Sequence, residues 1–464
     1  MSHHKSMSKS KIEEVFNAQK SFFLTSATLD IKFRKSQLLK LREAIRSNEA
    51  EITQALAKDL GKSTFESYAT EIGIVYEEIR LHLKKLHSWT KPKRVGSPIA
   101  AFPSKSFIKA EPFGVSLIIS PWNYPFQLAI APLVGAISAG NCAVIKPSEM
   151  SVHTSAVIEK IINGSFQENY IHVLNGDATA SEALLKQKFD FIFFTGSPRI
   201  GKIVMKAAAE NLTPVVLELG GKSPCIVDKN VDLKLVAKRI IWGKCINAGQ
   251  TCIAPDYVLV HKSIKEDLLL NLKSAITELY GDNPKENADY PRIINEANVN
   301  RLEKLMQSGK VYTGGLIEAK EKYFSPTLIV DAANDSALMQ EEIFGPLLPV
   351  VSFESIEDAI TFVKNKPKPL ALYLFTSDKK NLKLMLDQIS AGGVTVNDTI
   401  MHFTNANLPF GGVGNSGIGS YHGESSFKSF SHMKPVMKRA TWLDIPLRYP
   451  PFLKKLKLVK LVLK

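Results

Sequence analysis

The sequence predicts an α/β protein built from two parallel-sheet domains. Short apolar runs alternate with segments of helical spacing between residues 115 and 217, and the same alternation returns between 226 and 397. Continuous apolar strands separated by helices are typical of parallel sheets that are covered on both faces. A chain of 464 residues is also too long for a single hydrophobic core.

Composition describes an ordinary globular protein, with 45% hydrophobic and 22% charged residues. The four cysteines form no CxxC pair, so we predict no disulfide framework, no metal site and a reducing, cytoplasmic location. No apolar run approaches the ~18 residues that a membrane span needs. The net charge of +14 suits anionic cofactors. A nucleic-acid partner is not expected, because no basic-aromatic motif accompanies the charge.

The first 90 residues are predicted to be helical. Apolar residues recur at helical spacing from Ile12 onward, Gly61 stops one helix, and a further helix covers 66–89. We expect packing and surface here, and no chemistry. Residues 96–110 are then predicted to form a hairpin arm, or a loop, that leaves the main body.

Five strands are predicted next, with helices between them. Because crossovers are right-handed and ligands bind beyond the carboxyl ends of parallel strands, the residues at those ends are candidate site residues. The strands are 115–120, 142–145, 171–174, 189–194 and 214–217, and the helices are 126–138, 152–162 and 200–209.

A second set of strands follows, and residues 398–424 are predicted to be a glycine-rich loop. The strands are 226–227, 257–260, 328–330, 348–351, 370–375 and 392–397, and helices begin near 264, 298, 356 and 380. The tail, 449–464, predicts a basic amphipathic helix, with Phe452, Leu456, Val459 and Leu463 at helical spacing and lysines opposite. Such a helix can lie on an anionic membrane or dock on the protein itself, including across a dimer.

Cys252 is the candidate nucleophile, because the small residues before it leave room for a substrate carbonyl. Most lone cysteines are small buried hydrophobes, which is what we expect of Cys142, Cys225 and Cys245. Glu218 ends a buried strand, where desolvation would raise its pKa toward that of a useful base. The alternative for Glu218 is a salt bridge to a lysine.

Asn123 lies between two prolines and offers an amide donor for an oxyanion, with the Cys252 N–H as the second donor. Its alternative role is to serve a turn. Lys146 and Glu149 lie at a strand end, where they can hold ribose hydroxyls.

Gly196, Ser197 and Gly201 join a strand to a helix whose N–H groups can receive a pyrophosphate. A turn with a helix cap is the alternative, since no GxGxxG fingerprint is present. Gly220 permits close approach of a cofactor ring or substrate. Glu342 is a candidate ribose ligand and Phe344 a candidate support for a nicotinamide; the alternative is a solvated helix end and a core phenylalanine.

Together these segments resemble the aldehyde dehydrogenase superfamily over about residues 10–435. The matching motifs are PWNYP at 121–125, KPSE at 146–149, FTGS at 194–197, LELGGK at 217–222, GQTC at 249–252, EIFGP at 342–346 and PFGG at 409–412. The resemblance implies an aldehyde dehydrogenase-like fold, with two Rossmann-like domains and a small oligomerisation arm. It adds Trp122 and Leu219 to the cofactor-binding residues. The implied divisions are 1–220 (helices and NAD(P) domain, with the arm at about 96–110), 221–396 (catalytic domain), 397–440 (return segment and oligomerisation) and 441–464 (tail).

The short N-terminal part, and RYPP at 448–451 followed by a tail, resemble class 3, which includes fatty aldehyde dehydrogenases. This resemblance implies oxidation of medium- or long-chain aliphatic or aromatic aldehydes to acids, through a cysteine thiohemiacetal and thioester. Because Glu149 should repel a 2′-phosphate, NAD is the expected cofactor, with NADP also accepted. A homodimer is implied. The alternatives are a semialdehyde or non-phosphorylating glyceraldehyde-phosphate dehydrogenase, or a non-enzymatic peripheral membrane protein.

Overall fold

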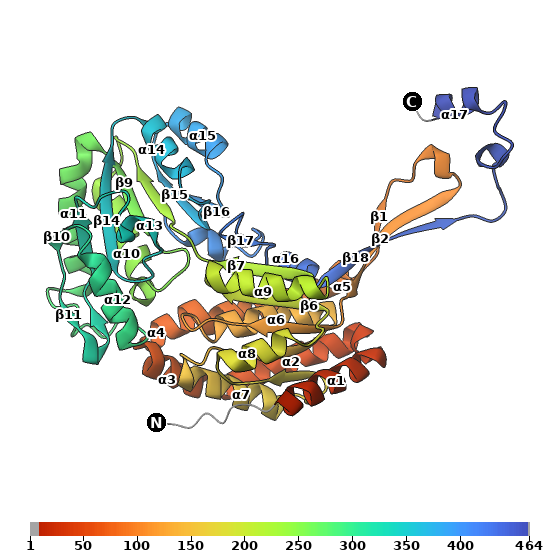
Figure 1. The fold of residues 1–464 in the computed structure, drawn as a ribbon, viewed down its shortest axis with the longest axis horizontal. Coiled ribbons are helices and arrows are strands. Elements are labelled where there is room, and N and C mark those ends of the chain that lie inside the picture. The colour runs from red at the N-terminus through yellow and green to blue at the C-terminus, as the bar shows by residue number, and fades with distance from the viewer. Residues whose placement is uncertain (1–8, 463–464) are drawn as a thin grey trace.

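The computed structural model describes residues 9–462 as two lobes with a long arm that projects from one of them (Figure 1). Residues 1–8, at the start of the predicted first division, lie outside the described residues. So do residues 463–464 of the predicted tail, which include Leu463. No helix within 9–462 is long and apolar enough to cross a membrane.

The first lobe contains a six-stranded sheet in the order β17-β7-β6-β3-β4-β5. The five predicted strands are present and parallel, but the prediction of a loop through 398–424 was wrong at residues 417–418, which pair antiparallel with β7. The bounds are β3 (Val115–Ile119), β4 (Cys142–Lys146), β5 (Ile171–Val173), β6 (Phe191–Gly196), β7 (Val215–Leu219) and β17 (Gly417–Ile418).

Helices cover both faces of this sheet. The chain moves outward from β3 to β4 to β5 and then returns past β3 to β6 and β7, so right-handed crossovers put the helices of the two halves on opposite faces. The first pair is α6 (Gln127–Ala139) and α7 (Val152–Ser165), and the second is α8 (Ala178–Leu185) and α9 (Pro198–Glu210). Every residue of α6 is buried, because further helices pack behind it.

The N-terminal segment supplies helices to both sides of this sheet. They are α1 (Lys9–Leu24), α2 (Ile31–Ser47), α3 (Glu49–Leu60), α4 (Thr64–Ser67) and α5 (Gly73–Trp89). Helices α2 and α5 pack behind α6, α3 packs on α7, and α1 lies against β3, β4 and α8. Gly61 ends α3 in the left-handed conformation, as its position predicted. The helix predicted over 66–89 is present, but it is not a regular α-helix throughout, because a π-helix (Tyr68–Ile72) joins α4 to α5. Short π segments are frequent at functional sites.

The second lobe is built on a seven-stranded sheet in the order β10-β13-β14-β9-β8-β15-β16, parallel except at its β10 edge. A two-stranded ribbon of β11 and β12 lies beside it. The bounds are β8 (Pro224–Val227), β9 (Tyr257–His261), β10 (Lys310–Thr313), β11 (Ile317–Glu318), β12 (Tyr323–Phe324), β13 (Thr327–Val330), β14 (Leu347–Phe353), β15 (Ala371–Phe375) and β16 (Gly393–Val396).

One helix of this lobe, α10 (Leu233–Cys245), was missed in the sequence. Its signals were present: Asp232 caps its first turn, and Val236, Ala237, Ile240 and Ile241 form a buried stripe. The other helices are α11 (Lys265–Tyr280), α12 (Glu296–Met306), α13 (Ala337–Gln340), α14 (Ile356–Lys364) and α15 (Lys379–Gln388).

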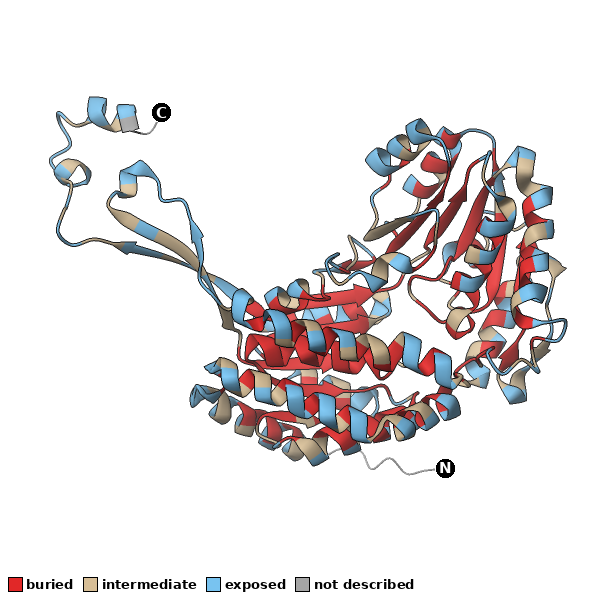
Figure 2. Cartoon of the chain, turned by 180° about the vertical axis from the view of Figure 1, so that it is seen from behind, coloured by how far each residue is buried: buried red, intermediate tan, exposed pale blue. Residues whose placement is uncertain are grey.

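The arm is a three-stranded antiparallel sheet of β1 (Lys93–Val95), β2 (Ser104–Pro112) and β18 (Ser431–Arg439), and α16 (Glu424–Ser429) leads into β18. The hairpin prediction therefore held, but a third strand comes from far along the chain. The tail ends in α17 (Leu456–Val462), so the helix begins after Phe452 and does not include it. Figure 2 shows that buried residues fill the two sheets and the helices against them, whereas the arm and tail are exposed or intermediate.

Candidate functional site

A cavity of about 1010 Å³ lies between the two lobes and takes its lining from both. Of the thirteen predicted site residues, ten line it: Trp122, Asn123, Gly196, Ser197, Glu218, Leu219, Gly220, Cys252, Glu342 and Phe344. Lys146, Glu149 and Gly201 do not. Segments more than 200 residues apart in the sequence therefore meet at one place.

Cys252 reaches the cavity from an unusual bend. Helix α10 ends at Cys245, and Asn247, Ala248 and Gly249 all adopt left-handed backbone conformations, with φ of 52°, 51° and 75°. Each such non-glycine residue costs roughly 1–2 kcal/mol. At Gly249 a side chain would not fit, because an added Cβ would lie 2.3 Å from the carbonyl oxygen of Gly345. The surrounding structure must therefore hold this bend in place.

The thiol of Cys252 is partly buried, and its chemistry follows from that. Burial raises its pKa, and the charges of Glu342 and Glu218 raise it further. The backbone N–H groups of Cys252 and Ile253 act in the opposite direction. Cys142, Cys225 and Cys245 are free and fully buried in strands or at the end of α10, as predicted for packing residues.

Glu218 lies near the carboxyl end of β7 and is only 3% exposed. Neither carboxyl oxygen has a hydrogen-bond partner among the described residues, so the alternative of a salt bridge to lysine is not what the structure shows. Burial raises the pKa of Glu218 well above its usual value. A carboxyl group in this state takes up a proton more readily than a solvated one.

Asn123 is buried, and its amide is partly engaged. Its Nδ2 donates to the carbonyl oxygen of Gln250 at 2.9 Å, and its own backbone oxygen accepts from Asn247 Nδ2 at 2.8 Å. Beside it, the hydroxyls of Tyr124 and Thr251 lie 2.6 Å apart. The loop from the first lobe is thus tied directly to the loop that carries Cys252.

The cofactor candidates Gly220, Glu342, Trp122 and Phe344 form one wall of the cavity. An added Cβ at Gly220 would lie 2.0 Å from Glu342 Oε2. Burial raises the pKa of Glu342 to about 8, and its Oε1 has no partner among residues 9–462. The rings of Trp122 and Phe344 meet edge to face at 5.2 Å. The bare backbone at Gly220 leaves room for a cofactor. The unpartnered oxygen of Glu342 can accept a hydrogen bond from a ribose hydroxyl, and the rings of Trp122 and Phe344 offer an aromatic surface to the nicotinamide.

The other cofactor candidates lie around the carboxyl ends of β4 and β6. Lys146 Nζ donates to Glu149 at 2.7 Å, so the two predicted ribose ligands are ion-paired with each other. Ser197 caps α9, and Gly201 is packed so closely that a Cβ would lie 2.7 Å from Leu219 Cδ2. Ser197 therefore has the helix-capping role expected as the alternative, and it also lines the cavity.

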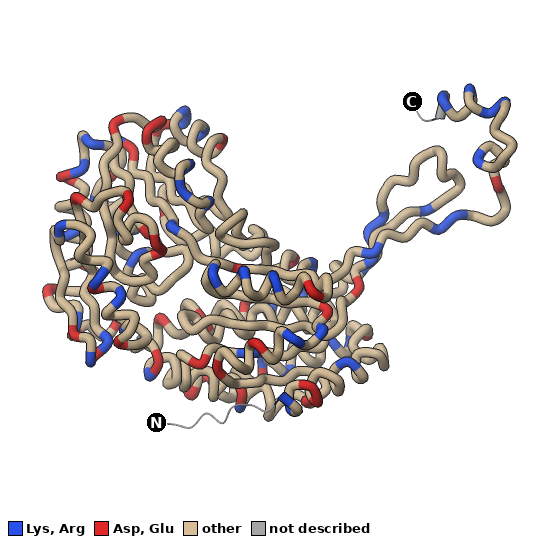
Figure 3. The backbone as a smooth tube through the Cα atoms, viewed as in Figure 1, with Lys and Arg blue, Asp and Glu red and all other residues tan. Residues whose placement is uncertain are grey.

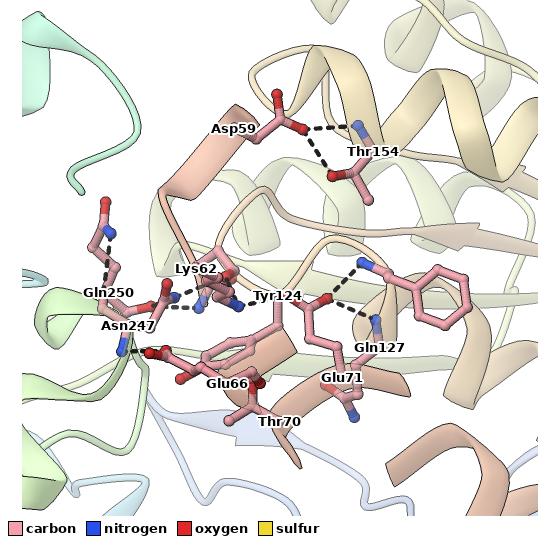
Figure 4. A network of polar contacts seen from close by, with 12 residues as sticks. Asp59, Lys62, Glu66, Thr70, Glu71, Tyr124, Gln127, Thr154, Asn247 and Gln250 are labelled. Carbon is pink, nitrogen blue, oxygen red and sulfur yellow. Dashed lines mark hydrogen bonds and ion pairs between the residues drawn. The ribbon is translucent and has the colours of Figure 1, made fainter. Parts of the chain in front are cut away.

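Sequence reasoning missed a buried polar network beneath the site (Figure 4). Lys62 donates to Glu71 at 2.5 Å and to the backbone oxygen of Asn123 at 3.3 Å. Glu71 also accepts from the N–H groups of Phe126 and Gln127, at the start of α6. Glu66 accepts from the Asn247 N–H at 2.7 Å. The expectation that the N-terminal helices supply only packing was wrong, since they hold both loops of the site.

Lys244 was also missed. It lies on α10 with its ammonium buried and without a hydrogen-bond partner in the described part of the chain. Burial lowers its pKa to about 8, although the charge of Asp256 opposes this shift. A lysine within the apolar run Ile240–Cys245 was a usable signal, whereas Glu66 and Glu71 resemble ordinary surface glutamates in the sequence.

Comparisons with known proteins agree with this arrangement. The aldehyde dehydrogenase family model matches residues 1–436. The 4,4'-diaponeurosporen-aldehyde dehydrogenase of Staphylococcus aureus (strain NCTC 8325 / PS 47) is 49% identical over 451 residues, which are 97% of this chain and 98% of that protein. The dimeric NADP-preferring aldehyde dehydrogenase of Canis lupus familiaris is 44% identical, over 96% of this chain and 99% of its own.

Among solved structures, the substrate-bound state of Staphylococcus aureus AldH matches with a TM-score of 0.96 and 48% identity, over 98% of this chain and 99% of that one. The indole-3-acetaldehyde dehydrogenase of P. syringae, solved with NAD+ and IAA, matches with a TM-score of 0.85 and 26% identity, over 94% and 90%.

The fold and the family match make this chain an NAD(P)-dependent oxidoreductase. It belongs to the aldehyde dehydrogenase family, whose members oxidise aldehydes to carboxylic acids. Within that family its relatives include family 3 member A2 of Pongo abelii, 45% identical over 92% of this chain and 89% of that protein. The expected likeness to class 3 is confirmed.

Proposed function

We propose that this enzyme oxidises apolar aldehydes, medium- or long-chain aliphatic or aromatic, with NAD as its preferred cofactor. The observation that carries this proposal is a group of large apolar side chains in the lining of the cavity that Cys252 reaches. The group includes Phe65, Leu128, Trp242, Ile246, Met401 and Phe403. Burial of apolar surface favours a hydrocarbon substrate by about 0.8 kcal/mol per methylene.

A substrate panel followed by NADH absorbance tests the proposal. We expect kcat/KM to fall from hexadecanal to benzaldehyde to succinic semialdehyde, with at least about a 100-fold difference between the first and the last. We also expect NAD to give a higher kcat/KM than NADP, because the carboxylate of Glu149 would face a 2′-phosphate. A preference for succinic semialdehyde would favour the semialdehyde alternative and contradict the proposal.

The proposed chemistry begins at Cys252, which attacks the aldehyde carbon as a thiolate. Burial raises the pKa of the thiol, and the backbone N–H groups of Cys252 and Ile253 oppose that rise and so favour the thiolate. The resulting oxyanion is stabilised by the Cys252 N–H and by the Asn123 amide, which has one N–H group left after its bond to Gln250. The adduct is a thiohemiacetal.

When bound, NAD(P)+ would accept the hydride that leaves this adduct, and Cys252 would keep the acyl group as a thioester. Of the residues present, Gly220 leaves room for the cofactor, and Glu342, Phe344 and Trp122 would hold it. Glu218 then takes a proton from water, and the water oxygen adds to the thioester carbon. Collapse of that adduct releases the carboxylic acid and restores the Cys252 thiolate.

The divisions at 220/221 and 396/397 also stand as proposals, with the first part binding the cofactor and the second carrying the nucleophile. The strands on either side support the first boundary, because β7 belongs to the first sheet and β8, the next strand in the chain, belongs to the second. We propose a homodimer formed through the arm, because β1 and β18 each have one outer edge without a strand partner among the described residues, and a relative is named as dimeric. The free cysteines suit the proposed cytoplasmic location.

We propose in addition that the tail contacts anionic membranes. Leu453, Leu456, Leu458 and Leu461 are exposed hydrophobic residues, and lysines alternate with them (Figure 3). Exposed apolar and basic side chains together are typical of helices that lie in a membrane interface.

Removal of residues 449–464 should abolish flotation with vesicles that contain phosphatidylserine. Reversing the charge of Lys454, Lys455, Lys457 and Lys460 to glutamate should weaken binding by at least about 100-fold, at roughly 1 kcal/mol per lysine. The intact enzyme should detach at high salt. Equal flotation of the intact and shortened chains would contradict the proposal, while unchanged hexanal oxidation by both would show that the enzyme itself is intact.

A further inference from the structure

The bend that carries Cys252 is held from outside by one carboxylate. Asn247 follows the end of α10 and has a left-handed backbone conformation, so its N–H group does not take part in the hydrogen-bond pattern of the helix. Glu66 accepts from this N–H at 2.7 Å in buried surroundings. Both groups are shown in Figure 4, where Glu66 approaches from the N-terminal helical segment toward the loop of the second lobe.

The same contact reaches the oxyanion donor. Asn247 uses its side-chain Nδ2 to bond the backbone oxygens of Asn123 and Gln250, at 2.8 Å and 3.1 Å. Asn123 in turn donates to the Gln250 oxygen. A displacement of Asn247 would therefore move the residues on both sides of the reacting carbonyl, although Glu66 itself is separated from Cys252 by five residues of loop.

The π-helix explains how Glu66 is available for this contact. Residues five apart in a regular α-helix are about 140° apart around its axis, so Glu66 and Glu71 would diverge. The wider π turn over Tyr68–Ile72 lets both point inward, Glu71 to Lys62 and α6, and Glu66 to Asn247. Glu66 also lines the cavity itself.

We propose that Glu66 is a positioning residue, whose carboxylate holds the left-handed bend so that the Cys252 thiol faces the cavity and the Asn123 amide. A hydrogen bond to a charged acceptor is about twice as strong as a neutral one. The bond therefore has its full strength only while Glu66 is ionised. This inference rests on the proposed role of Cys252 as the nucleophile.

The charge state of Glu66 is set by several neighbours. Burial raises its pKa to about 7, while the charge of Lys62 and the bond to Asn247 lower it. Glu71 and Asp289 raise it. The phenols of Tyr124 and Tyr280 also face it, and both titrate far above this range. The hydrogen bond from the Asn247 N–H to Glu66 should thus have its full strength above about pH 8, and it should weaken as the pH falls through 7.

The test compares Glu66→Gln and Glu66→Ala with a matched control, Glu43→Gln, which changes an exposed glutamate on α2. At pH 8.5 we expect kcat to fall about 10- to 100-fold in Glu66→Ala and less in Glu66→Gln, which keeps an acceptor, with little change in KM. The ratio of wild-type to Glu66→Gln kcat should approach one near pH 6, where both side chains are neutral.

A second readout needs neither cofactor nor turnover. We expect Glu66→Ala to slow alkylation of Cys252 by iodoacetamide about 5- to 10-fold, as followed by peptide mass, because the thiol leaves the cavity. Melting temperature shows whether a variant is folded, and if Glu66→Ala is not, Glu66→Gln carries the test. Folded variants with wild-type kcat at every pH and wild-type alkylation would overturn the inference. Full activity of a chain without the Cys252 thiol would instead overturn the proposed function.

Discussion

Replacing Cys252 with alanine should lower NAD-dependent aldehyde oxidation by at least about 10⁴-fold. Cys252 carries the only thiol among the described residues that line the cavity, and the backbone N–H groups of Cys252 and Ile253 oppose the rise in its pKa that burial causes. Steady-state rates with hexadecanal measure the loss. Binding of the cofactor, followed by fluorescence, should be nearly unchanged, since the substitution removes one small side chain.

Cys142→Ala is the matched control. Cys142 is buried in β4, where burial raises the pKa of its thiol, and it is not among the residues that line the cavity between the lobes. This variant should keep its activity within about threefold, with only a small loss of stability. Comparable activity in both variants would show that the reaction does not proceed through a covalent sulfur adduct.

Replacing Glu218 with glutamine should separate acylation from hydrolysis. We expect kcat to fall about 10²- to 10⁴-fold, because the water that attacks the thioester loses its base. The thioester should then accumulate, and intact-protein mass spectrometry should detect an acyl group on Cys252. Since burial raises the pKa of Glu218, wild-type deacylation should rise with pH through that raised value, and the variant should lose this dependence.

The control for this substitution is Glu210→Gln, at the exposed end of α9. It should deacylate at the wild-type rate. A Glu218→Gln enzyme that turns over normally without a trapped adduct would assign the base to another group, and Glu342, whose pKa burial raises to about 8, would be the next to test.

Much of the fold could be predicted because strands buried on both faces are continuous apolar runs. The ends of β3, β4, β6 and β7 could be predicted as a site because the carboxyl ends of parallel strands meet at one edge of the sheet, where ligands bind. Helix α10 was missed although its cap, Asp232, and its apolar stripe were present in the sequence.

Other features had no local signal. The pairing of β17 with β7 and of β18 with β2 joins segments about 200 and 320 residues apart, which no pattern within either segment encodes. Likewise Glu66 and Glu71 acquire their roles from a π-helix and from partners on other elements. The partners of a buried charge depend on tertiary packing, so they become visible only when the chain is folded.

The two-residue strand β17 has a consequence for how the protein is made. It is the outer neighbour of β7, the strand that bears Glu218, yet it lies beyond the whole second lobe in the chain. During synthesis, the first lobe therefore exposes an uncovered edge beside its catalytic carboxylate until residue 418 has left the ribosome. Nascent chains released before that point would expose the unpaired edge of β7 next to apolar surface that the second lobe has not yet covered. Unpaired strand edges of this kind pair with other chains and lead to aggregation.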